Sequence, residues 1–164
     1  MPKDIFNINE LISHNCCFDL QFRQDIRRER TGSPTYYRWK TQFIITLSKE
    51  KTEILKKIKN ILGCGSITTA KNQARLSIQK IEDINNCITP FLIKNKLNGT
   101  KKKDFELWRK AVNIIYNNKG KPITKWKKNE LFSLIQIHKS ISIYKTHPRQ
   151  AKWMEMAKSI TKTL

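Results

Sequence analysis

The chain has 164 residues, and its 33 lysines and arginines against 13 aspartates and glutamates give a formal charge of +20 and an isoelectric point of about 10.0. Charge this one-sided repels itself in a compact fold unless a polyanion neutralises it, so the composition favours a nucleic-acid partner over a merely soluble basic surface. A hydrophobic content of 38% excludes a disordered basic tail, and the lack of a long apolar run, signal peptide or lipidation motif argues against a membrane partner.

The first part of the chain predicts a short helix followed by a long hairpin. The helix is expected over residues 6–14. Residues 18–23 alternate between apolar and polar side chains, which is typical of a strand with one buried face. After the break at Thr31–Pro34, a second strand is expected with the odd-numbered residues from 39 to 47 on its buried face.

The next part predicts a second helix and a shorter hairpin. Ser48 is placed to cap a helix with apolar residues at helical spacing, and Gly63 is placed to end it. The hairpin is expected as a strand over 64–70, a turn near 71–72 and a strand over 74–78.

Helices complete the chain. A third helix is expected over 81–91, and Thr100 could cap a fourth that ends within 117–120. A fifth is expected over about 124–140, and Pro148 is placed to open a last one that reaches Leu164. The predicted fold class is therefore α+β, with the order αββαββα, an antiparallel sheet and additional C-terminal helices.

The cysteines and histidines predict no metal site. The four cysteines include no C-x-x-C pair, and the three histidines show no ligand spacing. Cys64 and Cys87 stand beside apolar residues and are interpreted as small buried side chains in a reducing compartment. The abundance of Lys, Ile and Asn favours an AT-rich, organellar origin, and secretion is not expected.

The polar side chains of the two predicted hairpins form the candidate binding surface. Arg and Lys reach guanine edges or phosphates, while Gln and Ser can donate and accept hydrogen bonds toward base edges. A polar strand face can also be simply the solvated side of an antiparallel sheet. Two adjacent hairpins that both carry basic and amide residues favour a nucleic-acid surface, made of Gln21, Arg23, Arg27, Arg38, Lys40, Gln42, Ser66, Thr68, Arg75, Ser77 and Gln79.

The middle of the chain carries a specific family pattern. An aliphatic-Pro-Phe run is followed by a short loop and then by a helix that opens with an Asp-Phe pair and continues with apolar residues. The matching positions are Pro90, Phe91, Leu97, Thr100, Lys101, Lys102, Asp104, Phe105, Trp108, Ala111 and Val112. This stretch resembles the LAGLIDADG family of homing endonucleases and intron maturases, and the resemblance extends over roughly residues 8–140.

The resemblance implies an architecture. It implies a LAGLIDADG-type αββαββα fold with a saddle-shaped sheet over residues 1–145, with a basic C-terminal helix over 146–164 appended. The family's nine-residue signature falls on residues 8–16, in a single copy. In the family, a chain with one signature works as a homodimer through that helix, so a homodimer or another partner subunit is implied.

The resemblance also implies where cleavage chemistry would take place. In the family the signature closes with an acidic metal ligand and a glycine, which here are Asn15 and Cys16. A neutral amide is a much poorer Mg²⁺ ligand than a carboxylate. The end of the second strand, where some members carry a glutamine, has Leu47, and Lys94 and Lys96 could lie near the scissile phosphates. Mg²⁺ is thus implied as a cofactor only if cleavage is retained.

Two functions remain open from the sequence. The first is a nucleic-acid binder with weakened or lost cleavage, acting on DNA or RNA as a maturase-like protein or as a structural component of an organellar ribonucleoprotein such as a mitoribosome. The second is an active homing endonuclease that makes Mg²⁺-dependent double-strand breaks in DNA. Asn15 and Leu47 favour the first, while the usual activity of the family favours the second.

Overall fold

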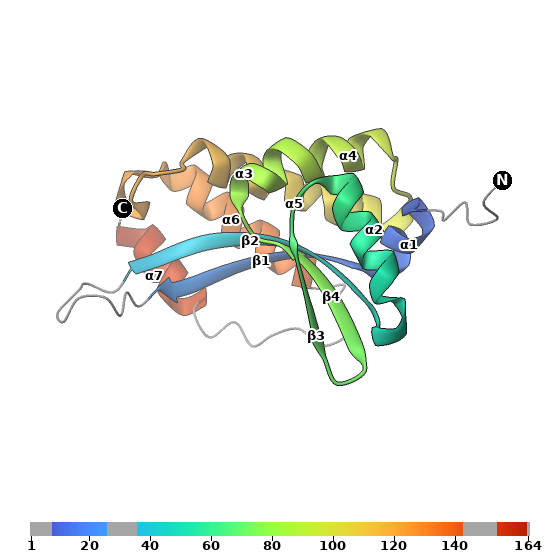
Figure 1. The fold of residues 1–164 in the computed structure, drawn as a ribbon. Helices are drawn as coiled ribbons and strands as arrows, with labels where there is room; N and C mark the ends of the chain where they lie inside the picture. The colour runs from blue at the N-terminus through green and yellow to red at the C-terminus, as the bar shows by residue number, and fades with distance from the viewer. Residues whose placement is uncertain (1–7, 26–35, 143–153, 164) are drawn as a thin grey trace. The chain divides into compact units, whose positions relative to one another are not determined.

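The computed structural model describes residues 8–25, 36–142 and 154–163, in which two pairs of strands each follow a helix and only helices follow the second pair (Figure 1). The elements are α1 (Ile8–Asn15), β1 (Cys16–Asp25), β2 (Tyr36–Ser48), the 3-10 turn η1 (Lys49–Lys51), α2 (Thr52–Leu62), β3 (Ser66–Ala70), β4 (Gln73–Ile78), α3 (Ile81–Asp83), the π-helical segment η2 (Ile84–Ile88), α4 (Thr89–Lys94), α5 (Gly99–Asn117), the 3-10 turn η3 (Ile123–Lys125), α6 (Lys128–Ser142) and α7 (Met154–Thr163).

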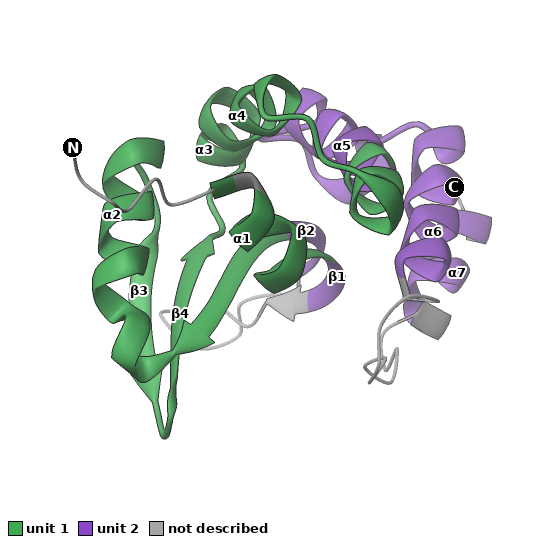
Figure 2. Cartoon of the chain, turned by 90° about the vertical axis from the view of Figure 1, so that its right-hand side faces the viewer, with its two compact units in different colours: residues 1–19, 42–106 green, residues 20–41, 107–164 purple. Residues whose placement is uncertain are grey.

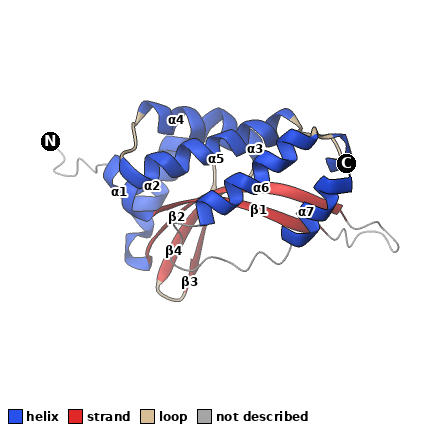
Figure 3. Cartoon of the chain, turned by 180° about the vertical axis from the view of Figure 1, so that it is seen from behind, coloured by secondary structure: helices blue, strands red, loops and turns tan. Residues whose placement is uncertain are grey.

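The four strands form one sheet in the order β1-β2-β4-β3, in which β4 pairs antiparallel with both β2 and β3 (Figure 3). This topology confirms the predicted α+β class, with its αββαββα order and additional C-terminal helices.

The chain divides into two compact units (Figure 2). Unit 1 comprises residues 1–19 and 42–106, and unit 2 comprises residues 20–41 and 107–164. The predicted boundary between residues 145 and 146 lies outside the described residues, as does the predicted helix opening at Pro148.

The core of unit 1 is built where α2 packs against the β3–β4 hairpin. The apolar face of β4 carries Ala74, Leu76 and Ile78, all buried, and α2 buries Leu55, Ile58 and Leu62 at helical spacing. Gly63 ends α2 as predicted. It has the left-handed φ of 75°, and its N–H donates to the Lys59 carbonyl at 2.8 Å.

The helix predicted over 81–91 is continuous but contains a π-helical segment. The Thr89 N–H bonds to the Ile84 carbonyl, five residues back. Pro90 follows directly, and proline has no N–H to donate and a ring that would clash with the carbonyl of Asn86. The wider turn accommodates that ring within the helical run.

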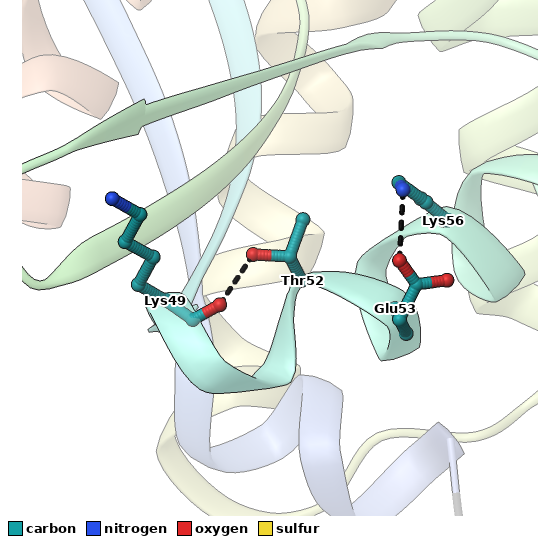
Figure 4. A network of polar contacts seen from close by, with 4 residues as sticks. All are labelled: Lys49, Thr52, Glu53 and Lys56. Atoms are coloured by element: carbon teal, nitrogen blue, oxygen red, sulfur yellow. Dashed lines mark hydrogen bonds and ion pairs between the residues drawn. The ribbon is translucent and has the colours of Figure 1, made fainter.

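The start of the second helix differs from the prediction. Ser48 occupies the N-cap position of η1 but makes no capping hydrogen bond with its side chain. The Thr52 hydroxyl instead donates to the Lys49 carbonyl, and one turn later Lys56 pairs with Glu53 at 2.8 Å (Figure 4). A 3-10 turn therefore leads into α2 without the predicted serine cap.

The other boundaries also shift. Helix α1 ends at Asn15, one residue later than predicted, and its predicted start at residue 6 lies outside the described residues. Helix α5 begins at Gly99, so Thr100 lies in its first turn instead of capping it. Helix α6 begins at Lys128 rather than near residue 124. The reason is Trp126, whose backbone is extended with ψ of 150° and whose indole N–H donates to the Lys121 carbonyl at 3.1 Å.

Aromatic side chains form much of the core of unit 2. The rings of Phe22 and Trp39 lie 5.1 Å apart, and Trp39 meets His138 edge-on at 6.3 Å. Trp108 on α5 is fully buried, as predicted for a core residue. In the described part of the chain, every helix is too short or too polar to cross a bilayer.

Candidate nucleic-acid interface

One face of the unit 1 strands is polar except for Ile44, which lies opposite Ser77, and Ala70, which lies opposite Gln73. Residues directly opposite in antiparallel strands share a face, and Arg75 of β4 lies opposite Thr46 of β2 and Thr68 of β3. The same register places Gln73 opposite Ser48. We call this set the polar strand face of unit 1, formed by Thr46, Ser48, Ser66, Thr68, Gln73, Arg75 and Ser77.

This face includes four residues predicted from the sequence. Ser66, Thr68 and Arg75 are exposed, and Ser77 is half-buried. Gln79 is also exposed, but it follows the last residue of β4. Thr46, Ser48 and Gln73 were not predicted. They continue the same period-two pattern by one or two residues. Extending the predicted strands by that much would have identified them.

Unit 2 carries four further predicted residues on its parts of β1 and β2. Arg23 and Arg38 are exposed, while Gln21 and Lys40 are half-buried. Arg27 lies outside the described residues. Arg23 and Arg38 are therefore the solvent-exposed members of the predicted set on the described strands of unit 2.

The expected exposure of Gln42 is corrected by the structure. Its side chain is only 8% exposed, and Ile44, two residues further along β2, is equally buried. Predicting exposure from alternating polarity assumes that one face of the strand is in contact with solvent. Strand β2 is a central strand, and both of its faces are covered over residues 42–45. Gln42 is therefore not open to a base edge.

A hollow lies at the edge of the polar strand face of unit 1, where α1 ends. It is open, has a volume of about 450 Å³, and is lined by Asn15, Thr46, Leu47, Ser48, Lys51, Asn72 and Gln73. We call it the α1 hollow. The Lys49 N–H donates to the Asn72 carbonyl at 2.9 Å and ties η1 to the β3–β4 turn. The lining thus combines three segments that are distant in the sequence.

Asn15 has a structural partner. Its side-chain amide donates to the Leu11 carbonyl at 3.0 Å. Leu11 lies one helical turn before Asn15, so this hydrogen bond adds a side-chain contact to the C-terminal end of α1. A carboxylate at position 15 could not donate this hydrogen bond, and its charge would oppose the negative end of the helix dipole.

Two lysines lie near the junction of α1 and β1. Lys51 lines the α1 hollow, and the Lys101 ammonium donates to the backbone carbonyl of Cys16. Burial raises the pKa of the Cys16 thiol to about 12, with Lys101 partly offsetting the effect. The thiol is therefore protonated at neutral pH and cannot serve as a thiolate ligand or nucleophile.

The donors around Asn15 do not fit a hard divalent cation. Mg²⁺ requires oxygen ligands that include carboxylates, whereas the α1 hollow offers a neutral amide, other neutral residues and one ammonium. Within residues 8–25, 36–142 and 154–163, no three His, Cys, Asp or Glu side chains come together as a potential metal site. The cation would meet Lys51 without a compensating anion.

The two predicted lysines stand apart from the hollow lining. Both Lys94 and Lys96 are exposed. Lys94 is the last residue of α4, which corrects its expected place in a loop, and only Lys96 lies in the connection to α5. Neither lines the α1 hollow. Lys51, which does, was missed because its position near Asn15 arises only in the folded chain.

The structure corrects the expected burial of two cysteines. Cys64 and Cys87 are partly exposed rather than buried. Burial raises the pKa of the Cys64 thiol to about 11, and the neighbouring Cys87 adds to the rise. The Cys64 thiol is therefore protonated at neutral pH, which is consistent with a small, unreactive side chain.

Replacing Asn15 is expected to lower stability. Asn15→Ala removes the hydrogen bond to Leu11 and should lower the free energy of unfolding by about 1 kcal/mol. Asn15→Asp should lower it by somewhat more, since a carboxylate then faces the carbonyls at the end of α1. Thermal unfolding at neutral pH measures both. An Asn15→Asp protein as stable as the wild type would contradict the structural role of the amide.

The strand order, and a helix that ends in a hollow at the edge of a polar strand face, define an αββαββ protein of the homing-endonuclease type. Residues 17–112 match the model of the family described as LAGLIDADG endonuclease, and because this match covers more than half of the sequence, the chain belongs to that family.

Solved structures show the same fold. The homing endonuclease I-TnaI is 15% identical, with 94% of this chain and 95% of that chain covered and a TM-score of 0.68. I-AabMI, a LAGLIDADG meganuclease bound to uncleaved DNA, is 23% identical, with 84% of this chain and 44% of that chain covered and a TM-score of 0.64. The K262A mutant of I-SmaMI is 17% identical, with 93% of this chain and 48% of that chain covered and a TM-score of 0.72.

The chain thus spans nearly the whole of I-TnaI but less than half of the I-AabMI and I-SmaMI chains. No curated protein matches it.

Proposed function

We propose that this protein binds nucleic acid through the polar strand face of unit 1 and the exposed arginines on the strands of unit 2, and that it has weakened or lost the cleavage activity of its family. The observation that carries the proposal is Asn15 at the end of the signature helix, bonded to Leu11 in a hollow without carboxylates. Binding needs cations and hydrogen-bond donors, which the chain retains. Metal-dependent cleavage needs anionic ligands, which this site lacks.

The charge distribution supports the binding role. The formal charge of +20 calls for a polyanionic partner, and exposed arginines occur on the strands of both units. Arg75 stands among serine and threonine side chains on unit 1, and Arg23 and Arg38 stand on unit 2. Such mixtures of arginine with small polar residues suit simultaneous contacts to phosphates and base edges.

A second copy would not restore the metal site. The likeness to meganuclease chains about twice as long favours a homodimer of this chain, paired through α1 as the family resemblance implies. A two-fold axis at α1 then brings a second Asn15, and not a carboxylate, to the centre of the dimer. The proposal therefore holds for the monomer and for the homodimer.

The nucleic acid of this proposal is DNA or structured RNA. A protein that keeps the fold without cleavage can act as a maturase-like intron RNA binder or as a structural part of an organellar ribonucleoprotein such as a mitoribosome. An organellar location accords with the Lys-, Ile- and Asn-rich composition. The alternative is an active homing endonuclease, which family membership favours.

A cleavage assay separates the two candidates. The purified full chain is incubated with a library of randomised duplex DNA, with Mg²⁺ or with EDTA, and the ends are sequenced. We expect no specific double-strand breaks in either condition, while the same protein shifts labelled DNA or RNA in a gel. Specific breaks that require Mg²⁺ would overturn the loss of cleavage and point to a carboxylate outside the hollow lining, such as Glu10 or Asp19.

A further inference from the structure

We infer that the α1 hollow is a seat for a backbone phosphate of the bound nucleic acid, and that it holds this phosphate without a bridging metal ion. The inference rests on the proposed nucleic-acid binding and specifies what the hollow does in it. A carboxylate in this place would repel a phosphate unless a divalent cation lay between them. The uncharged Asn15 removes that repulsion and the need for the cation.

The lining has the charge that a phosphodiester requires. Lys51 is exposed and contributes one ammonium, which balances the single negative charge of one phosphodiester group. The other lining residues are neutral. A Mg²⁺ ion would add two positive charges beside this lysine, whereas a phosphate neutralises it.

The lining also has the hydrogen-bond donors. Ser48, Asn72 and Gln73 are exposed and carry a hydroxyl and two primary amides that can donate to phosphate oxygens. Their backbones are fixed by the Ser48–Gln73 strand pair and by the hydrogen bond from the Lys49 N–H to the Asn72 carbonyl. The backbone segments that carry the donors are therefore held in place before a ligand arrives, which lowers the entropic cost of ordering them on binding.

The location connects the hollow to the proposed binding surface. Thr46, Ser48 and Gln73 belong both to the lining and to the polar strand face of unit 1. Arg75 lies directly opposite Thr46 in the sheet. A backbone that runs along this face thus passes from Arg75 to the hollow within the same unit. The phosphate there fixes the register of the strand on the protein and carries no sequence information.

The experiment compares two lysine variants of the full chain. Lys51→Gln removes the ammonium of the hollow, and Lys57→Gln removes an exposed ammonium from α2 outside the lining. Both lower the net charge equally. Fluorescence anisotropy measures their affinity for labelled mixed-sequence duplex DNA and duplex RNA in EDTA over a series of salt concentrations. The two duplexes distinguish which nucleic acid supplies the phosphate.

We expect Lys51→Gln to weaken binding about tenfold, the equivalent of one charged hydrogen bond. On DNA it should reduce the slope of log affinity against log salt by about 0.9, which corresponds to one phosphate contact. Lys57→Gln should leave the slope unchanged. Equal effects of the two variants would overturn the phosphate seat while leaving nucleic-acid binding intact.

A second variant tests independence from metal. Wild-type affinity in EDTA should be at least as high as that in Mg²⁺ at matched ionic strength, because Mg²⁺ can only compete for the phosphates. Asn15→Asp should weaken binding in EDTA, because its carboxylate meets the phosphate, and Mg²⁺ should restore it. A wild type that binds only with Mg²⁺ would overturn the inference. A wild type that binds neither duplex in a salt-dependent way would overturn the proposed function as well.

Discussion

Raising the salt concentration from about 50 to about 200 mM is expected to weaken binding of duplex DNA by about 10³- to 10⁵-fold, the range for proteins that make roughly six to ten phosphate contacts. The reason is counterion release. Each phosphate neutralised by Lys or Arg frees bound cations, and added salt opposes their release. With a formal charge of +20, the protein has enough cations for that many contacts. Fluorescence anisotropy over a salt series gives the slope, and an affinity insensitive to salt would contradict the polyanion partner.

Charge reversal locates the contacts. Arg38→Glu combined with Arg75→Glu changes one exposed arginine on the strands of each unit. The matched control combines Lys57→Glu with Lys59→Glu on the exposed side of α2 and changes the net charge by the same amount. We expect a larger loss of affinity and a shallower salt slope for the arginine pair. Equal losses would show that net charge, and not the strand faces, determines binding.

Replacing Trp108 by alanine is expected to lower the free energy of unfolding by roughly 3–5 kcal/mol. Trp108 is fully buried, and Ala111 and Val112 on the same helix are also fully buried, so its removal leaves a large cavity in the core of unit 2. For a chain of this size, such a loss lowers the midpoint of thermal unfolding by roughly 10 °C. Differential scanning calorimetry measures the shift.

Trp126→Ala is the matched control for that experiment. Trp126 is half-buried, and its indole N–H donates a hydrogen bond to the Lys121 carbonyl. Its replacement should cost about 1 kcal/mol, since little packing is lost. If both tryptophan variants lose the same stability, the core position of Trp108 is wrong.

Local chemistry made much of the fold predictable. Gly63 ends a helix because a left-handed residue favours glycine, and the turn at 71–72 joins two alternating strands with Lys71 at φ of 53°. Trp108 lies on the apolar stripe of its helix and is buried. In each case the deciding contacts lie within a few residues, so the pattern can be read from the sequence.

Boundaries that depend on distant or specific contacts were predicted less well. The start of α6 depends on an indole hydrogen bond to Lys121, and the π-helical segment before Pro90 depends on how that helix accommodates the ring. Gln42 has the polarity of an exposed strand residue, yet its strand is covered on both faces. Polarity predicts exposure only where the neighbours leave a face open.

The sequence by itself determined the charge, the αββαββ order, the family and the amide at position 15, because each of these is a property of residue type or of local spacing. The tertiary structure alone decided what surrounds Asn15. The α1 hollow joins the end of α1, the end of β2 with η1, and the β3–β4 turn, and Lys51 reaches it only when Ser48 pairs with Gln73. Strand register sets that pairing, and register depends on the packing of the whole apolar face rather than on any one segment.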